Sequence, residues 1–324
     1  MAESAQQIRN FALIGAAGYV APRHMQAIRS TGNRLVAALD PSDSVGVIDS
    51  FFPDSAFFTE FERFDRHIDK LRREAGDEKV DYVSICSPNY LHDSHIRFAL
   101  RSDAAAICEK PLVLNPWNID GLIEAEAASD RRVNTILQLR VHPAIVALRE
   151  RLRGDGGLKH EVDLTYVTAR GRWYDYSWKG DERKSGGIAT NIGVHFFDML
   201  HFIFGALQES RVHLSEPSRA AGWLEYEAAR VRWFLSVDAE DLPETVRESG
   251  QRTYRSITVD GEEIEFSGGF ASLHDRSYEL ILQGEGFGLE DSRSAIETVA
   301  AIRTAKPIGP KGECHPLAAA RGKR

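Results

Sequence analysis

The chain has 324 residues, enough for about two domains of ordinary size. Hydrophobic residues make up 43% and charged residues 27% of it, which excludes a disordered chain, a fibrous repeat and a coiled coil. The net charge of −8 argues against a nucleic acid as the main partner. No apolar run approaches the roughly 20 residues that cross a bilayer.

Cysteine content and the polar start of the chain indicate its compartment. Cys86, Cys108 and Cys314 form no Cys-x-x-Cys pair, and their odd number argues against a disulfide framework. The first ten residues lack the apolar core of a signal peptide. These features predict a cytoplasmic protein.

Short apolar runs alternate with amphipathic stretches through the first half of the chain. Five buried strands are predicted, at residues 11–14, 35–39, 82–86, 104–108 and 133–137. Helices are predicted between them, up to residue 28 and near 60–75, 90–101 and 116–129. Strands buried on both faces and separated by helices are typical of a parallel, doubly wound sheet. We therefore predict an α/β Rossmann domain over residues 1–143.

The pattern changes after about residue 155. Strands with alternating polarity are predicted at 162–168, 231–237 and 254–259, and helices at 194–204, 271–283 and 291–303. The pair Asp260-Gly261 predicts a hairpin. Residues 144–324 are thus expected to form an α+β domain with an open, mostly antiparallel sheet. A return of the C-terminal segment to the first domain is left open.

A glycine-rich turn follows the first predicted strand. In residues 15–21, GAAGYVA, Gly15 and Gly18 permit a tight turn, and the helix N-terminus behind them can bind a pyrophosphate. An alanine takes the place of the middle glycine in the usual Gly-x-Gly-x-x-Gly spacing, and a turn that binds no nucleotide is the alternative. Val20 is a candidate cofactor contact, and Tyr19 either packs against nicotinamide or fills the turn.

Asp40 ends the second predicted strand, 22 residues after Gly18. A carboxylate there can accept hydrogen bonds from the adenosine ribose and repels a 2′-phosphate. The next residues supply no arginine for such a phosphate, so NAD is preferred over NADP. A turn or helix-cap role is the alternative for Asp40.

Two further segments carry candidate catalytic groups. Glu109-Lys110-Pro111 follows the fourth strand, where a lysine could orient a substrate hydroxyl or tune a proton relay, although such a triplet is often a surface turn. Near the start of the later helix, Asn191, His195 and Asp198 are spaced to approach one side. A histidine there can move a proton near neutral pH, or be a buried structural residue. No third ligand accompanies His195 and Asp198, so no metal is predicted.

These segments, together with Ser87-Pro-Asn89-Tyr-Leu-His92, occur in one order along the chain. In this the sequence resembles the glucose–fructose oxidoreductase/inositol dehydrogenase (Gfo/Idh/MocA) family over essentially its full length. The resemblance implies that Lys110 contacts substrate and that His195 is the acid/base. It also implies cofactor-binding positions at Ser87, Asn89, His92, Glu109 and Lys110.

One departure from the family pattern affects the proton relay. The family often has aspartate four residues before the histidine, where this chain has Asn191. Because an amide cannot act as a carboxylate base, the relay must rest on His195 with Lys110. Asn191 is then a positioning or substrate-binding residue.

Within the family, residues 11–24, 84–92, 190–198 and 230–237 resemble enzymes that oxidise the C3 hydroxyl of UDP-N-acetylglucosaminuronic acid with NAD. That resemblance implies a UDP-linked aminouronic sugar as substrate and a role in the biosynthesis of O-antigen or lipopolysaccharide. Some of these enzymes recycle their cofactor with 2-oxoglutarate and others release NADH, and both remain open here. It also implies a homodimer or homotetramer.

Residues 170–184 mix aromatic and cationic side chains just before the catalytic helix. Aromatic rings can cover a uracil or a sugar, and cations such as Lys179 and Lys184 can bind diphosphate and carboxylate. The alternatives are a solvated loop or a subunit contact.

From the motifs and the resemblance together, we predict an NAD-dependent sugar dehydrogenase. A dehydrogenase of another sugar or polyol, and a non-catalytic dinucleotide-sensing regulator, are the alternative functions.

Overall fold

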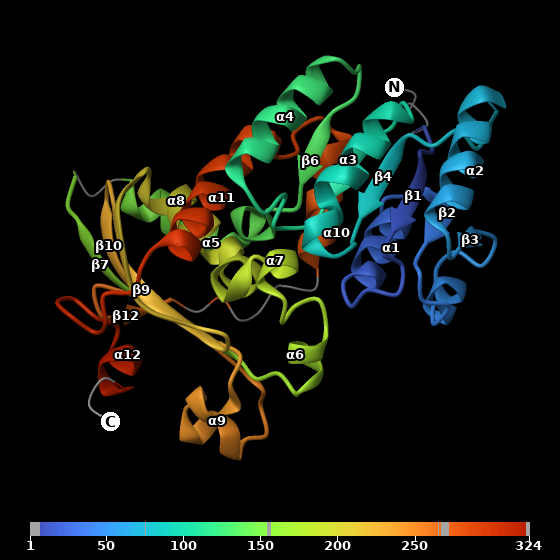
Figure 1. Ribbon diagram of the computed structural model, residues 1–324. Helices are drawn as coiled ribbons and strands as arrows, with labels where there is room; N and C mark the ends of the chain where they lie inside the picture. The colour runs from blue at the N-terminus through green and yellow to red at the C-terminus, as the bar shows by residue number, and fades with distance from the viewer. Residues whose placement is uncertain (1–6, 75, 154–156, 265, 267–271, 322–324) are drawn as a thin grey trace. The chain divides into compact units, whose positions relative to one another are not determined.

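The computed structural model describes residues 7–74, 76–153, 157–264, 266 and 272–321 (Figure 1). Contacts divide these residues into two compact units. The first comprises 7–113, 117–136 and 272–291, and the second comprises 114–116, 137–266 and 292–321. The predicted boundary at 143/144 falls inside the second unit. Residues 272–291, from the C-terminal part of the chain, belong to the first.

The first unit is built on a sheet of six parallel strands. Their order is β3 (Ala56–Phe58), β2 (Arg34–Leu39), β1 (Asn10–Ile14), β4 (Tyr82–Ile85), β5 (Ala105–Cys108) and β6 (Val133–Thr135). The strand order reverses between β1 and β4, and ligands of such sheets bind at the carboxyl ends of the strands at this point. The five predicted strands are confirmed. The edge strand β3 was not predicted, because three half-buried residues give no periodicity.

Helices α1 (Ala21–Ser30), α2 (Phe61–Glu74), α3 (His92–Arg101) and α4 (Pro116–Ala127) connect these strands, with short turns η1 (Gly46–Ser50) and η2 (Asn89–Leu91). Helix α10 (Leu273–Leu282) packs against α1. Its Tyr278 and Ile281 join Phe11 and Met25 in one buried core, and the Phe11 and Tyr278 rings stack with centroids 5.8 Å apart. The burial of this apolar face explains why α10 belongs to the first unit.

The second unit contains a six-stranded sheet that is antiparallel except where β7 pairs with β10. Its order is β12 (Glu262–Glu263), β11 (Thr253–Val259), β7 (His160–Thr168), β10 (Ala229–Ser236), β9 (Arg219–Tyr226) and β8 (Leu207–Glu216). The hairpin between β11 and β12 is confirmed. Asp260 and Gly261 both have positive φ, 52° and 84°, as a type I′ turn requires.

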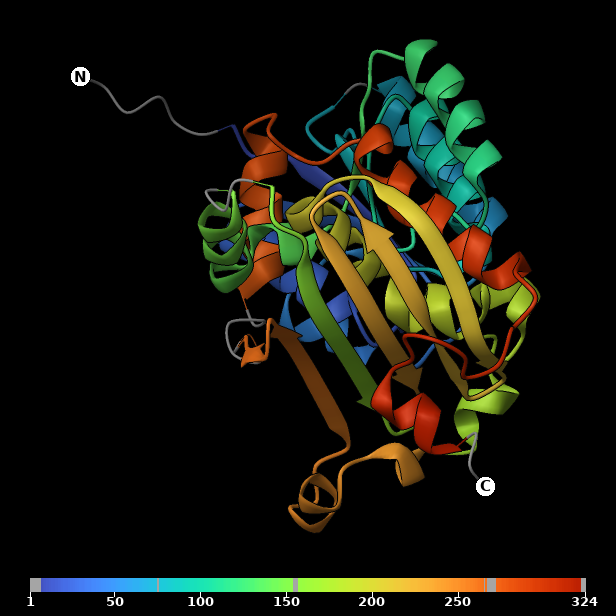
Figure 2. The same ribbon diagram turned by 90° about the vertical axis from the view of Figure 1, so that its left-hand side faces the viewer.

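A different helix packs against each face of this sheet (Figure 2). Trp233 packs its ring on Phe197 of α8 (Val194–Phe204), with centroids 5.3 Å apart. On the opposite face, Phe234 stacks on His315 and shares an apolar cluster with residues of α12 (Pro316–Arg321).

The remaining helices are α5 (Pro143–Leu152), α6 (Trp173–Tyr176), α7 (Glu182–Ser185), α9 (Glu244–Glu248) and α11 (Leu289–Thr304), with 3-10 turns η3 (Gln138–Val141) and η5 (Ala239–Asp241). Among the described residues, no helix has both the length and the apolar character needed to cross a bilayer.

Candidate active site

The glycine-rich turn lies tightly against the ends of two strands. Gly15 has φ +91°, and a Cβ on it would lie 2.6 Å from the carbonyl carbon of Cys86. A Cβ on Gly18 would lie 3.0 Å from the Gly15 carbonyl oxygen. Glycine is thus required at position 15. The turn leads into α1, whose N-cap residue Val20 makes no side-chain hydrogen bond to the first turn of the helix. Tyr19 beside it is 89% exposed. This is a cradle of the kind that receives a dinucleotide pyrophosphate.

Asp40 sits beside this turn, half-buried. Its Oδ2 accepts the Ala17 N–H at 2.9 Å, and its Oδ1 accepts the Ser42 N–H at 2.8 Å. Each carboxylate oxygen can accept a second hydrogen bond, so ribose hydroxyls can still be bound. Asp40 therefore also fixes the glycine-rich turn to the end of β2.

The residues after β4 are mostly engaged within the protein. The Ser87 hydroxyl hydrogen-bonds His95 Nδ1 at 2.8 Å, and Asn89 is buried in η2. His92 lies between the Ser87 and Pro111 carbonyl oxygens, 2.8 and 2.7 Å from its Nε2 and Nδ1. Burial lowers the pKa of His92 against the opposing effect of both carbonyls. One ring nitrogen of His92 faces a carbonyl of the loop after β4 and the other faces a carbonyl of the loop after β5, so His92 joins these two loops. A neutral ring donates to one of the two carbonyls at a time.

Glu109 and Lys110 end β5 with different environments. Lys110 is half-buried, whereas the Glu109 side chain is buried and turned inward. Glu109 Oε2 accepts the Lys110 main-chain N–H at 3.2 Å, and Oε1 accepts from His24 Nε2 at 3.1 Å and His274 Nε2 at 2.9 Å. Sequence reasoning missed both histidines. A signal existed for one of them, because His24 is a polar residue on the buried face of α1.

In the second unit, Asn191 lies in a π-helical turn, η4 (Ala189–Gly193), directly before α8. Its side-chain N–H donates to the Tyr174 hydroxyl at 2.7 Å, which joins Asn191 to the aromatic segment 170–184. His195, in the first turn of α8, is half-buried, and its ring centroid is 6.0 Å from that of Tyr166. Single π-helical turns occur frequently at functional sites.

Asp198 has another role than the one its spacing suggested. Only 2% exposed, it pairs with Arg140, whose Nη2 lies 2.7 Å from Oδ1 and whose Nε lies 3.1 Å from both oxygens. The pair links η3 to α8. In the described part of the chain, the cluster able to hold a metal ion is His24, Glu109 and His274, and it includes neither His195 nor Asp198.

The segment 170–184 presents aromatic rings and cations at the surface. Trp173 and Tyr176 are 53% and 88% exposed, while Tyr174 is buried. The Lys179 ammonium lies 4.2 Å from the centroid of the Trp178 ring, and Lys184 lies in α7. Exposed aromatics such as these, on the short helix α6, suit a ligand or protein contact.

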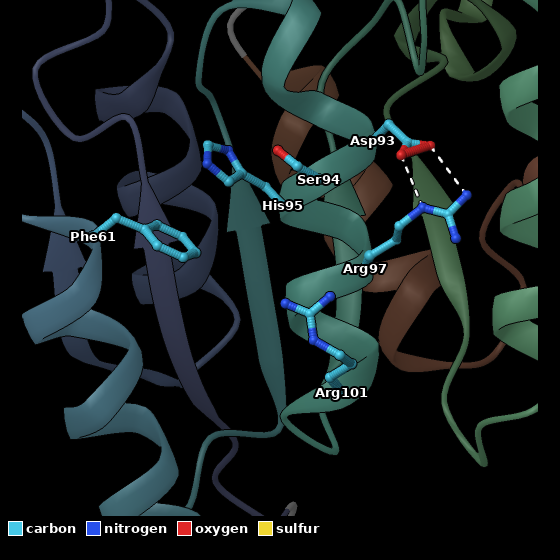
Figure 3. Close-up of a pocket in the computed structure, with 6 residues that line it drawn as sticks. All are labelled: Phe61, Asp93, Ser94, His95, Arg97 and Arg101. Carbon is cyan, nitrogen blue, oxygen red and sulfur yellow. Dashed lines mark hydrogen bonds and ion pairs between the residues drawn. The ribbon is translucent and has the colours of Figure 1, made fainter.

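A pocket of about 300 Å³ opens beside α3 in the first unit (Figure 3). Phe61 stacks on His95 there, with centroids 5.5 Å apart, and Arg97 Nε donates to Asp93 at 2.8 Å. Its lining contains no residue of the predicted site. Its link to that site is the hydrogen bond of His95 with Ser87.

Two family models match the chain. "Oxidoreductase family, NAD-binding Rossmann fold" matches residues 9–136, and "Oxidoreductase family, C-terminal alpha/beta domain" matches residues 158–246. Among curated relatives, the inositol 2-dehydrogenase of Rhizobium meliloti is 27% identical over 201 residues, 60% of this chain and 54% of that protein. The D-glucoside 3-dehydrogenase of Escherichia coli is 27% identical over 132 residues, 39% of this chain and 36% of that protein. The chain thus matches about a third to a half of the length of these relatives.

Solved structures match over more of the chain. The WlbA (WbpB) dehydrogenase from Thermus thermophilus, in complex with NAD and α-ketoglutarate, is 54% identical with a TM-score of 0.91, covering 96% of this chain and all of that one. The same dehydrogenase with NAD and UDP-GlcNAcA matches equally well. The Bordetella pertussis WlbA dehydrogenase, at 15% identity, 93% and 96% coverage and a TM-score of 0.74, shares the fold. With a match to both its NAD-binding Rossmann fold and its C-terminal alpha/beta domain, this chain belongs to the Gfo/Idh/MocA family of NAD-binding oxidoreductases.

Proposed function

We propose that this protein oxidises the C3 hydroxyl of UDP-N-acetylglucosaminuronic acid to a ketone, using NAD. The observation that carries the proposal is the 54% identity, over 96% of this chain, to a dehydrogenase solved with NAD and UDP-GlcNAcA. The alternative of a dinucleotide sensor is weakened because Lys110 and His195 are both present.

The first unit fits the dinucleotide. Gly15 and Gly18 form a cradle that a Cβ would fill, α1 begins behind it, and Asp40 stands beside it with accepting oxygens. NAD, when bound, accepts the hydride that leaves the sugar carbon. The carboxylate of Asp40 favours NAD over NADP because it repels a 2′-phosphate.

Three residues have separate proposed roles at the C3 hydroxyl: proton transfer, orientation of the hydroxyl and positioning of the sugar. His195 takes the hydroxyl proton on an imidazole nitrogen as the C3–H bond breaks and the carbon–oxygen bond becomes double. Lys110 donates to the same oxygen and orients it. Asn191, fixed by its bond to Tyr174, positions the sugar and takes no proton.

The segment 170–184 is the proposed recognition element for the anionic part of the substrate. Lys179 and Lys184 supply positive charge for the diphosphate and the uronic carboxylate, and exposed Trp173 and Tyr176 supply rings for uracil or sugar. These contacts would give an acidic protein a local site for anions.

The setting of the reaction is also part of the proposal. 2-Oxoglutarate is a candidate acceptor for recycling NADH, since the Thermus thermophilus enzyme was solved with α-ketoglutarate. The product would serve O-antigen or lipopolysaccharide biosynthesis in the cytoplasm. The open sheet of the second unit is the proposed surface for a homodimer or homotetramer.

The test is incubation of the purified protein with NAD and UDP-N-acetylglucosaminuronic acid, with and without 2-oxoglutarate. The sugar nucleotide is followed by mass spectrometry and NADH by absorbance. We expect a 3-keto product, and a loss of about 10²- to 10⁴-fold in turnover for His195→Ala with NAD affinity retained. The exposed Lys311→Ala is the matched control and should turn over normally. Turnover of an unlinked polyol without any 3-keto sugar nucleotide would refute the proposal.

A further inference from the structure

Three buried polar side chains in the first unit form a cluster that the proposed reaction does not use directly. His24 from α1, Glu109 after β5 and His274 from α10 are 0%, 6% and 1% exposed. The two histidine Nε2 atoms lie 3.1 and 2.9 Å from Glu109 Oε1. Tyr278 and Ser84 extend the cluster, since the Tyr278 hydroxyl is 2.8 Å from His24 Nδ1 and 2.6 Å from Ser84 Oγ.

These contacts have one consistent assignment of protons. A carboxylate only accepts, so both histidines must donate their Nε2–H to Glu109. In a neutral His24 ring, Nδ1 is then an acceptor, and the Tyr278 hydroxyl donates its hydrogen bond to it. Tyr278 in turn accepts from Ser84. The chain of donors therefore runs from Ser84 through Tyr278 and His24 and ends on the Glu109 carboxylate.

The cluster keeps Glu109 ionised in the protein interior. Burial acts to raise its pKa, but the hydrogen bonds from His24 and His274 outweigh this and hold the pKa of Glu109 well below its usual value. Burial lowers the pKa of His24, so its ring is neutral at pH 7. Among the described residues, the side chains that hydrogen-bond the Glu109 carboxylate are these two histidines rather than a lysine or an arginine. A buried carboxylate of this kind is a common feature of functional sites.

The charge is connected to the residue that follows it. Glu109 Oε2 accepts the main-chain N–H of Lys110 at 3.2 Å, so the orientation of the carboxylate restrains the main chain that carries Lys110. We propose that His24 and His274 are positioning residues for Lys110, which they hold at the carboxyl end of β5 through the Glu109 carboxylate. The inference rests on the proposed function, in which Lys110 contacts the reacting hydroxyl.

The same atoms could instead bind a metal ion, since one ligand atom from each residue lies within 4.8 Å of the others. The two arrangements differ in their protons. A metal needs both Nε2 atoms unprotonated, whereas the hydrogen-bonded cluster needs both protonated. The separations of 2.9 and 3.1 Å are those of N–H···O hydrogen bonds and favour the second arrangement.

The first test reads these protons directly and needs no substrate. The full-length protein is labelled with 15N-histidine, and the His24 and His274 signals are assigned by their loss in His24→Gln and His274→Gln. We expect a proton on the Nε2 atom of both rings at pH 7, with no stoichiometric metal by elemental analysis. Unprotonated Nε2 atoms, or one bound metal per chain, would overturn the proposal.

The second test separates positioning from folding. His274→Gln keeps an N–H near the place of Nε2, and His274→Leu removes it. We expect His274→Leu to lower kcat about 10- to 100-fold while KM for the sugar changes little, and His274→Gln to restore most of the rate. With one donor lost, the pKa of Glu109 rises, so the acid limb of the rate profile should move to higher pH in His274→Leu alone.

Two outcomes of this second test would overturn the proposal. In the first, the fraction of the variant protein that binds NAD, measured by calorimetry, falls by the same factor as kcat. That result would mean that the substitution affected only folding. The other is an unchanged acid limb in His274→Leu. If the wild-type protein does not oxidise the UDP-sugar, the proposed function fails, and the proton assignment is still decided by the first test.

Discussion

At the scale of single residues, the sequence identified groups by type and spacing, and the structure showed what holds them. Asp40 was predicted from its position after a strand, and it proves also to accept two main-chain N–H groups around the glycine-rich turn. Glu109 was predicted next to Lys110. Its partners His24 and His274 lie 85 and 165 residues away along the chain, which no local pattern can show.

Substitution of Asp40 separates its two functions. Asp40→Asn keeps an accepting oxygen but loses the charge, so we expect it to lose preference for NAD over NADP with little loss of stability. Asp40→Ala also loses the acceptor for the turn and should weaken NAD binding by about 1.5–3 kcal/mol. Dissociation constants for both dinucleotides, by calorimetry, check this. An unchanged preference in both variants would contradict the ribose assignment.

At the scale of elements, periodicity predicted the strands and helices whose burial is regular. The helix expected at 194–204 is α8, Val194–Phe204. Strands β8 and β9 were not predicted, and in β9 the small residues Ala220, Ala221 and Gly222 follow Arg219 and resemble a turn. Gly222 is needed there because a Cβ would lie 2.7 Å from Trp233 Cζ2 and against the Arg211 carbonyl oxygen. Close packing between strands therefore requires a glycine at this position, and that glycine makes the segment look like a turn in the sequence.

The glycine-rich turn can be tested against a glycine that has room. Gly15→Ala combines φ +91° with a Cβ 2.6 Å from the Cys86 carbonyl carbon, whereas Gly32→Ala has φ +74° and open space. We expect Gly32→Ala to cost about 1–2 kcal/mol from strain alone. Gly15→Ala should lower Tm further and abolish NAD binding. Equal Tm values for the two variants would show that the contact with Cys86 can relax.

The ion pair between η3 and α8 predicts a strong, non-additive effect. Arg140→Met leaves Asp198 buried without this partner and should destabilise the protein by about 3–5 kcal/mol. Asp198→Leu combined with Arg140→Met also removes the buried carboxylate, so the double variant should be more stable than Arg140→Met. Urea unfolding of the three variants measures this. Additive losses would mean that the two residues do not act as a pair.

At the scale of the whole molecule, buried histidines couple stability to pH. Burial lowers the pKa of His95, in the first unit, and of His315, in the second, from 6.5 to about 4. The unfolded chain binds these protons more readily, so stability is complete above pH 6.5 and is lost as pH falls toward 4. Each histidine contributes about 3 kcal/mol to this loss.

Thermal unfolding between pH 7.5 and about 4.5 checks this expectation. Tm should stay level down to about pH 6.5 and fall below it, and His95→Gln, which keeps a hydrogen-bonding partner for Ser87, should make the fall shallower. A Tm that is constant over this range would contradict the assignment of neutral buried rings.

The sequence by itself determined the fold class, the glycine-rich turn, the NAD cofactor and the family, because these depend on local spacing, strand burial and short motifs. Only the tertiary structure decided that Asp198 pairs with Arg140, that α10 returns to the first unit, and that two distant histidines hold Glu109. Each of these depends on which side chains meet in the interior. Such contacts are selected by packing and by the need of buried polar groups for hydrogen-bond partners. A local sequence pattern shows neither, because the residues that meet are far apart along the chain.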